Sequence, residues 1–259
     1  MGVQGLWPLL EPAARPTKLE SLRGRRLAID ASIWLHQFIK AIKDKEGNAL
    51  PNSHILGFLR RICKLLYYGI KPVFVFDGQT PEIKRKTIVT FLTSLEHNSP
   101  AQVRQHLHSE ITQFRQRQTR EERYASEVNA EMVSDIQLLL RLFGIPFTTA
   151  PTEAEAECAQ LSQQGLIDGI VTDDSDVFLF GGTQVFRHMF NQAKSVEYYL
   201  LADLGQEMAI DRTILIQLAY LLGSDYTDGI PGVGLVNALE ILNEFRGPAA
   251  LADFKTWWL

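Results

Sequence analysis

The sequence predicts an α/β fold, with a mostly parallel central sheet and helices on both faces of that sheet. Two observations support this prediction. Short, continuously apolar runs alternate along the chain with longer segments of helical periodicity. Continuous apolar runs are typical of strands buried on both faces, and their alternation with helices favours a parallel sheet. With 259 residues, of which 46% are hydrophobic, the chain can form one large domain or two smaller ones.

The N-terminal third of the chain predicts two buried strands that each end in an acid. The expected elements are a strand at 25–31, a helix at 33–42 capped by Ser32, a helix at 54–68, a strand at 73–76 and a helix that begins at Pro81. Asp30 ends the first strand, and Asp77 follows the second. A single acid after a strand is more often a cap of a helix or turn than a functional residue.

The rest of the chain predicts further strands and several helices. After a polar, solvated helix at 101–130 we expect a helix at 131–143, a strand at 145–149, an acidic helix with Thr152 as its N-cap, strands at 166–172, 183–187 and 195–199, a helix to Leu222 capped by Asp211, a helix at 235–245 and a short helix at 251–259. The weakest pattern in the chain lies at 90–102.

Charge is divided unevenly along the chain. Residues 1–92 contain 15 Lys and Arg against 7 Asp and Glu, whereas residues 151–259 contain 5 against 16. A basic part favours contacts with phosphates, and an acidic part favours metal binding. The same pattern would arise if the two oppositely charged parts attracted each other without any functional role. Cys63 and Cys158 lie in apolar helical segments, where we expect buried free thiols. No signal peptide and no membrane-spanning run are expected.

Acidic side chains gather in two neighbouring segments. Ordinary capping explains one or two of the glutamates that open the acidic helix, but not the aspartates that follow the next apolar run. These residues are Glu153, Glu155, Glu157, Asp173, Asp174 and Asp176. Acids at the carboxyl ends of strands lie where open α/β sheets bind ligands. Together with Asp30, Asp77 and Asp225 they form a candidate site for a hard cation such as Mg²⁺ or Mn²⁺.

Two observations extend this hypothesis to nucleic acid. Two hard cations about 3.5–4 Å apart, held by carboxylates, are a standard device for phosphodiester cleavage. The glycine-rich turn at 229–234 precedes a predicted helix, and its backbone amides could approach a phosphate. An ordinary turn between two helices explains this segment about equally well. Phosphate contacts of this kind position a nucleic acid without reading its bases.

Six segments of the chain carry a family resemblance. They are MGVQGLW at 1–7, LAIDAS at 27–32, VFVFDG at 73–78, APTEAEAEC at 150–158, TDDSD at 172–176 and LGSDY at 222–226. In this order they resemble the flap endonuclease/XPG family of structure-specific nucleases, over nearly the whole chain. The stretch from 47 to 78 is most similar to the XPG branch, the nucleotide-excision-repair nuclease. Flap endonuclease itself is the next most similar.

The resemblance implies a metal site and a catalytic lysine. Metal binding would fall on seven carboxylates: Asp30, Asp77, Glu153, Glu155, Asp174, Asp176 and Asp225. They would hold two Mg²⁺ ions, for which Mn²⁺ can substitute. Lys84 would contact the scissile phosphate and act in catalysis with Asp77 and Glu153. The resemblance gives no role to Glu157 and Asp173, which we expect to be caps or solvated acids.

A DNA-binding surface is implied as well. It would comprise Gly2, Arg60, Arg61, Lys64, Lys84, Arg85, Gly229, Gly232, Val233 and Gly234. The glycine-rich turn would belong to a helix–two-turn–helix element at about 211–245, which holds duplex DNA and a K⁺ ion. Val3, Leu6 and Trp7 would lie close to a hydrophobic wedge, although core packing is the preferred interpretation for Trp7.

The chain also departs from the family pattern. The position of a second catalytic arginine reads Thr90-Phe-Leu-Thr-Ser, and no basic residue lies between Lys86 and Arg104. We therefore expect a catalytic core without the long spacer and the C-terminal tail of the XPG branch. Its regions would be an N-terminal nuclease region at 1–92, a shortened gateway or spacer remnant at 93–130, and an internal nuclease region at 131–259. The order of residues 90–125 stays open.

These inferences predict a Mg²⁺-dependent endonuclease that cuts DNA near a junction between duplex and single strand. The resemblance implies the 3′ incision of nucleotide excision repair. The alternatives are a flap endonuclease, a ribonuclease with a similar acidic α/β domain, and a DNA-junction binding module that does not cut. We expect a monomeric nuclear protein without a membrane partner, and repair factors that bind through the missing segments.

Overall fold

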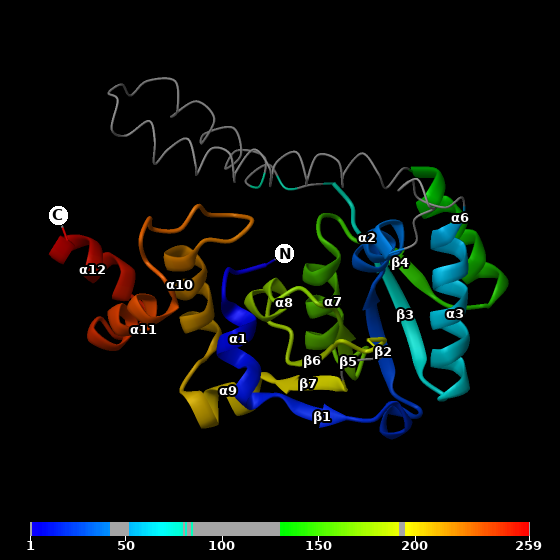
Figure 1. The fold of residues 1–259 in the computed structure, drawn as a ribbon, viewed down its shortest axis with the longest axis horizontal. Helices are drawn as coiled ribbons and strands as arrows, with labels where there is room; N and C mark the ends of the chain where they lie inside the picture. Colours follow the sequence, from blue (N-terminus) through cyan, green and yellow to red (C-terminus); the bar gives the residue numbers. More distant parts are fainter. Residues whose placement is uncertain are drawn as a thin grey trace.

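The computed structural model describes residues 2–41, 52–79, 81, 84, 130–191 and 195–258 (Figure 1). The predictions for 90–102 and 101–129 and for Arg85 therefore lie outside the described residues. In the described ranges the chain has the predicted α/β architecture. No helix in these ranges is both long enough and apolar enough to cross a membrane.

A seven-stranded sheet forms the centre of the molecule. Its strands, in spatial order, are β1 (Arg15–Thr17), β7 (Val196–Leu200), β6 (Gln184–Arg187), β5 (Gly169–Val171), β2 (Arg26–Asp30), β3 (Lys71–Phe76) and β4 (Phe147–Thr149). The four pairs from β6 to β4 are parallel, whereas β7 runs antiparallel to β6 and β1. The prediction of a mostly parallel sheet is therefore confirmed, and the parallel strands share one carboxyl edge.

Helices cover both faces of the sheet, as predicted. Along β2, Leu27 and Ile29 pack into one hydrophobic core with α2 (Ala31–Ala41), α3 (Ser53–Tyr67) and α6 (Ala130–Leu142). Ala28 points to the opposite core, because successive side chains of a strand alternate between its two faces. That core contains residues of α1 (Leu6–Leu10), α7 (Ala154–Gln163), α8 (Asp176–Leu179) and α10 (Arg212–Leu222).

The C-terminal helices extend this second core away from the sheet. They are α9 (Leu201–Met208), α11 (Leu235–Glu244) and α12 (Ala250–Trp258). Figure 1 shows α11 and α12 beyond α10, farthest from the strands. Asp211 caps α10 as predicted, because its Oδ1 accepts a hydrogen bond of 2.9 Å from the backbone N–H of Ile214.

Two predicted helix caps are wrong. Ser32 lies inside α2, and Asp30 Oδ1 instead accepts a hydrogen bond of 3.1 Å from the N–H of Ile33. Thr152 does not cap α7, because Glu153 occupies the N-cap position of its backbone. In both places an acid predicted to bind metal lies at the start of the helix.

Several elements near the N-terminus were not predicted. These are α1, the short strand β1 and two 3₁₀ helices at Glu11–Ala13 and Leu19–Leu22. Helix α9 was not predicted either. Cys63 and Cys158 are both free thiols, as expected, but Cys63 is exposed and only Cys158 is buried. The apolar stripe of α3 runs through Ile62 and Leu65, which leaves Cys63 on the outer side of that helix.

Candidate active site

The site is built where the strand order changes direction. From β2 the chain continues to β3 on one side, while β5 pairs with β2 on the other side. Open α/β sheets bind ligands at such a switch point, outside the carboxyl ends of the strands. Asp30 ends β2 and is 1% exposed. Its Oδ2 accepts a hydrogen bond of 3.1 Å from Thr172 Oγ1, which follows β5.

The segment after β5 brings two further aspartates to this edge. Thr172 Oγ1 also accepts a hydrogen bond of 3.1 Å from the N–H of Asp174. Asp174 Oδ1 in turn accepts one of 3.0 Å from the N–H of Asp176, at the start of α8. Asp176 Oδ1 is buried and has no hydrogen-bond partner among the described residues. An unsatisfied buried carboxylate oxygen is costly, so it is a natural position for a cation.

The N-terminal segment packs against these aspartates. A Cβ atom on Gly2 would lie 2.3 Å from Ser175 Oγ and 2.5 Å from Asp174 Oδ1. The N–H of Val3 donates a hydrogen bond of 3.0 Å to the same Ser175 Oγ. The structure therefore places Gly2 beside the acids, and any larger residue there would displace Asp174.

Asp77 approaches the site from the end of β3. Its Oδ1 accepts a hydrogen bond of 2.9 Å from the N–H of Ala154, so Asp77 caps α7 from another segment. Its own N–H donates to Ser32 Oγ at 3.0 Å. Gly78 lets the segment after β3 lie against the backbone at Ala150. A Cβ atom on Gly78 would lie 1.9 Å from the carbonyl oxygen of Ala150.

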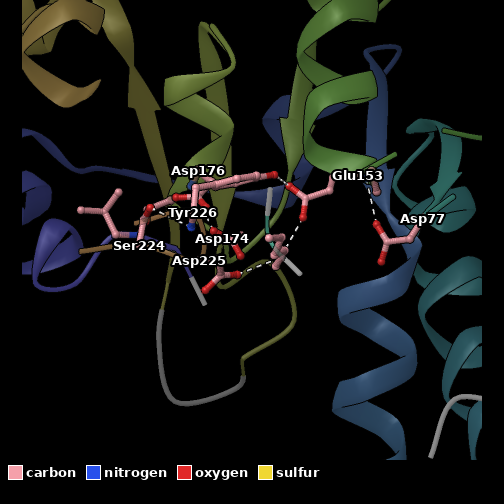
Figure 2. A network of polar contacts seen from close by, with 11 residues as sticks. Asp77, Glu153, Asp174, Asp176, Ser224, Asp225 and Tyr226 are labelled. Atoms are coloured by element: carbon pink, nitrogen blue, oxygen red, sulfur yellow. Dashed lines mark hydrogen bonds and ion pairs between the residues drawn. The ribbon is translucent and has the colours of Figure 1, made fainter. Parts of the chain in front are cut away.

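Lys84 lies between two of the predicted metal ligands. Its Nζ is 2.7 Å from Glu153 Oε1 and 2.9 Å from Asp225 Oδ2. Tyr226 donates a hydrogen bond from its hydroxyl to the other oxygen of Glu153, Oε2. Figure 2 shows Glu153 and Tyr226 directed toward one another, with Asp174, Asp176 and Asp225 in the same network. A single ammonium thus neutralises carboxylates from two separate segments.

Burial and mutual repulsion raise the pKa of the acids around this network. Burial is the largest cause in each case, and it raises the pKa of Asp30 and of Asp176 to about 8 and that of Asp174 to about 6. The neighbouring charge of Asp77 adds to the effect at Asp30, and that of Asp174 adds to it at Asp176. Burial, followed by the charge of Asp30, also raises the pKa of Glu155.

The neighbouring carboxylates also stabilise the protonated form of Lys84. Burial lowers the pKa of Lys84, but Asp225 and Glu153 outweigh this effect and raise it above its usual value. The seven predicted metal ligands therefore belong to one electrostatic cluster, which includes Lys84 as its cation. The seven carboxylates come from five segments of the chain: the end of β2, the end of β3, the start of α7, the segment after β5 and the turn after α10.

The oxygen-only donor set, the unpaired Asp176 oxygen and the raised pKa values all suit a hard divalent cation. As the side chains stand, however, the described part of the chain contains no group of three or more His, Cys, Asp or Glu residues arranged to hold a metal ion. Lys84 occupies the position between Glu153 and Asp225 instead. With Lys84 in this position, its ammonium supplies positive charge between these two carboxylates.

The predicted phosphate-binding residues of α3 differ in their surroundings. Arg60 and Lys64 are exposed, which leaves their charges accessible. Arg61 is half-buried, and its guanidinium donates a hydrogen bond of 2.8 Å to Gln37 Oε1. It lies between 4.4 and 5.0 Å from the ring centroids of Trp34, Phe38 and Phe190. Beside it is a cavity of about 450 Å³, to which Gln37 and Asp173 also contribute.

The glycine-rich turn lies between α10 and α11, as predicted. Gly232 and Gly234 are exposed at this turn, whereas Gly229 and Val233 are half-buried. Gly229 and Gly232 adopt the left-handed backbone conformation, with φ of 73° and 81°. The turn after α10 also contributes Asp225 and Tyr226 to the carboxylate cluster, so the two predicted sites share one segment.

Three residues near the N-terminus belong to the core. Val3 and Leu6 are buried there, which agrees with core packing. Trp7 is half-buried and packs against Phe178 and Tyr199, in agreement with the core packing predicted for it. The Trp7 indole also donates a hydrogen bond of 3.0 Å to the carbonyl oxygen of Asp173.

Sequence reasoning missed two residues of the site. Thr172 holds Asp30 and Asp174 together, and Tyr226 holds Glu153. Asp173 was expected to be a cap or a solvated acid, but it is half-buried. Its carboxylate accepts hydrogen bonds from Gln37 Nε2 at 2.7 Å and from the N–H of His188 at 3.0 Å. Thr172 lies next to the aspartates of the TDDSD segment, and Tyr226 follows the aspartate of the LGSDY segment. Their positions beside predicted metal ligands could have identified them.

Comparisons with known proteins agree on one group of relatives. The family model described as the XPG N-terminal domain matches residues 1–97, and the XPG I-region matches residues 144–225. DNA repair protein rad13 of Schizosaccharomyces pombe is 53% identical over 148 residues, which cover 57% of this chain and 13% of rad13. Flap endonuclease 1 of Drosophila yakuba is 32% identical over 268 residues, which cover 98% of this chain and 67% of that protein.

The fold is similar to that of solved nuclease structures. The catalytic core of Rad2 in complex with DNA substrate matches with a TM-score of 0.81 and 46% identity, over 98% of this chain and 72% of that chain. The chain spans only 13% to 16% of the first four curated relatives that it matches.

Proposed function

Because the chain belongs to the XPG and flap endonuclease family, we propose that it is a divalent-metal-dependent DNA endonuclease that cuts near a junction between duplex and single strand. The observation that carries this proposal is the cluster of carboxylates around Lys84 at the switch point of the sheet. A protein that only binds DNA has little reason to keep an anionic pocket, since such a pocket repels phosphates.

The metal site would use the seven carboxylates of this cluster. We assign metal binding to Asp30, Asp77, Glu153, Glu155, Asp174, Asp176 and Asp225. Two Mg²⁺ ions, when bound there, would supply positive charge to stabilise the transition state of phosphodiester hydrolysis. Burial is the main cause of the raised pKa of Asp30 and Asp176, and positive charge in the site would offset the repulsion that adds to it.

Lys84 would contribute to the reaction directly. Its ammonium lies within the carboxylate cluster and stays protonated at neutral pH, because Asp225 and Glu153 raise its pKa. With metal ions held by the carboxylate cluster, this ammonium would lie beside the scissile phosphate. There it would stabilise the negative charge that develops during hydrolysis.

DNA would be recognised by its shape rather than by its base sequence. The glycine-rich turn offers backbone amides to a duplex, and exposed Arg60 and Lys64 offer charges to phosphates. We propose that Gly2, Arg61, Arg85 and Val233 add to this surface, and that a K⁺ ion binds at the turn. The similarity to a Rad2 core in complex with DNA substrate supports this assignment.

The identity values favour the XPG branch. The chain is 53% identical to rad13 over 57% of its length and 46% identical to the Rad2 catalytic core over 98%, against 32% to flap endonuclease 1 of Drosophila yakuba over 98%. We therefore propose the 3′ incision of nucleotide excision repair, in the nucleus, as the biological reaction. A 5′ flap endonuclease is the second candidate, because the flap endonuclease match extends over 98% of the chain.

The test is a cleavage assay with three labelled DNA molecules of one sequence: a splayed-arm junction, the complete duplex and the single strand. In Mg²⁺ we expect cutting close to the junction, little cutting of the other two molecules, and none in EDTA. A 5′ flap substrate, run in parallel, separates the two candidate reactions. Tight junction binding without cutting in Mg²⁺ or Mn²⁺ would contradict the proposed activity and favour a binding module.

A further inference from the structure

Tyr226 joins parts of the site that are far apart in the sequence. Its hydroxyl donates a hydrogen bond to Oε2 of Glu153, which lies 73 residues earlier. Lys84 Nζ donates to Oε1 of the same carboxylate at 2.7 Å. Each oxygen of Glu153 therefore has a partner, and the two partners come from different segments. Figure 2 shows the Tyr226 side chain directed toward Glu153.

The turn after α10 holds the Tyr226 ring in place. The N–H of Tyr226 donates a hydrogen bond of 3.2 Å to Ser224 Oγ, and the N–H of Ser224 donates one of 2.8 Å to the carbonyl oxygen of Thr227. The ring meets Phe180 edge to face, with centroids 6.3 Å apart. A side chain fixed in this way loses little conformational entropy when it binds Glu153.

We propose that Tyr226 is a positioning residue of the nuclease reaction, and that its hydroxyl orients Glu153 and thereby the ammonium of Lys84. This inference rests on the proposed function. The Glu153 side chain is only 13% exposed, so water cannot easily replace the phenol at Oε2. Without the phenol, the carboxylate would turn to share both oxygens with Lys84, and the ammonium would move.

The same turn contributes a second contact to the lysine. Asp225 directly precedes Tyr226, and its Oδ2 lies 2.9 Å from Lys84 Nζ. The Tyr226 ring centroid is itself 5.7 Å from this nitrogen. The turn therefore contacts Lys84 directly through Asp225 and indirectly through Glu153. This turn leads directly into the glycine-rich segment proposed to hold duplex DNA.

The test compares Tyr226→Phe with Tyr220→Phe. Both substitutions remove one phenol hydroxyl, but Tyr220 is 57% exposed on α10 and lies outside the described contacts of the site. The first readout is the NMR resonance of the Lys84 side chain in the metal-free chain, identified by its loss in Lys84→Met. The second is kcat and KM for cleavage of splayed-arm DNA in Mg²⁺.

In Tyr226→Phe we expect the Lys84 resonance to shift toward that of a solvated lysine, and kcat to fall about tenfold, equivalent to about 1.4 kcal/mol. KM stays within about twofold of the unaltered chain, because the phenol does not bind the substrate. Tyr220→Phe leaves both readouts unchanged.

An unchanged Lys84 resonance with unchanged kcat in Tyr226→Phe would overturn the positioning role, and so would a loss confined to KM. If the unaltered chain cuts no junction DNA, the proposed function fails. The Lys84 resonance then still decides whether Tyr226 positions the lysine.

Discussion

Lys84 Nζ lies 2.7 Å from Oε1 of Glu153, although 69 residues separate the two in the sequence. The same ammonium lies 2.9 Å from Asp225 Oδ2. One cation therefore joins the segment after β3, the start of α7 and the turn after α10. Since these segments come from both family-matching regions, the site is complete only when both regions fold together.

Replacement of Lys84 by methionine tests its role in catalysis. This change removes the ammonium and keeps a side chain of similar length. We expect the cleavage rate of junction DNA to fall at least about 100-fold, because a charge that stabilises the transition state is lost. DNA affinity, measured by fluorescence anisotropy, should change only a few-fold. Lys71→Met, an exposed position at the opposite end of β3, is the matched control, and equal losses in the two variants would refute the assignment.

Thr172→Val tests the hydrogen bonds that hold two strand ends together. Valine has the same shape but leaves Asp30 Oδ2 and the N–H of Asp174 without a buried partner. We expect the free energy of unfolding of the metal-free chain to fall by about 1–3 kcal/mol. Urea denaturation measures it. The control is Thr183→Val at an exposed position, which should change the free energy of unfolding by no more than about 0.5 kcal/mol.

The raised pKa values predict how stability depends on pH. Asp30 and Asp176 have a pKa of about 8 in the folded chain, against roughly 3.9 in an unfolded chain. Between these values the folded chain binds more protons than the unfolded chain, so stability decreases as the pH rises. We expect the Tm of the chain in EDTA to be lower at pH 8 than at pH 5.5.

A substitution at Asp176 checks the source of this pH dependence. Asp176→Asn removes one titrating group, so the fall in Tm between pH 5.5 and pH 8 should become smaller. Added Mg²⁺ should raise the Tm of the unaltered chain at pH 8, because an ion that binds only the folded state stabilises it. A Tm that rises between pH 5.5 and pH 8 in EDTA would show that these acids are not buried together.

Gly78→Ala tests the close approach of two segments beside Asp77. The added Cβ would lie 1.9 Å from the carbonyl oxygen of Ala150, so the backbone must shift. We expect a loss of stability of about 1–3 kcal/mol, measured by thermal unfolding. Gly205→Ala in α9 is the control, because no atom lies within 4 Å of its added Cβ. That change should leave stability unchanged or raise it by up to about 1 kcal/mol. A Gly78→Ala variant as stable as the control would contradict the close approach.

The fold and the carboxylates were predictable because both depend on local patterns. Apolar runs marked β2 and β3, and the acids that follow them lie at the carboxyl edge of the sheet. Parallel pairing of Ile29 with Val171 then places Asp30 beside Thr172, a contact that requires knowledge of the register. The link between Tyr226 and Glu153 depends on how the turn after α10 packs, which no local pattern specifies.

Helix caps and exposure were harder to predict for a related reason. Ser32 is a good N-cap residue, but the helix already begins at Ala31, and Asp30 directly before it accepts the hydrogen bond from the N–H of Ile33. Cys63 lies in an apolar helix yet is exposed, because Ile62 and Leu65 on another side of α3 face the core. Arg61 carries a charge, but three aromatic rings surround its guanidinium. For Cys63 and Arg61, the packing of α3 against the rest of the fold decided between two locally acceptable outcomes.

The most direct test of the central claim is cleavage of splayed-arm DNA in Mg²⁺ by three forms: the unaltered chain, Asp174→Asn and Asp253→Asn. Asp174 is buried in the carboxylate cluster, whereas Asp253 is an exposed acid on α12, so both changes remove one charge but only the first alters the site. We expect junction-proximal cutting by the unaltered chain and by Asp253→Asn, and a loss of at least about 100-fold in Asp174→Asn. Equal cutting by all three forms would contradict a carboxylate-bound metal site at the end of β5.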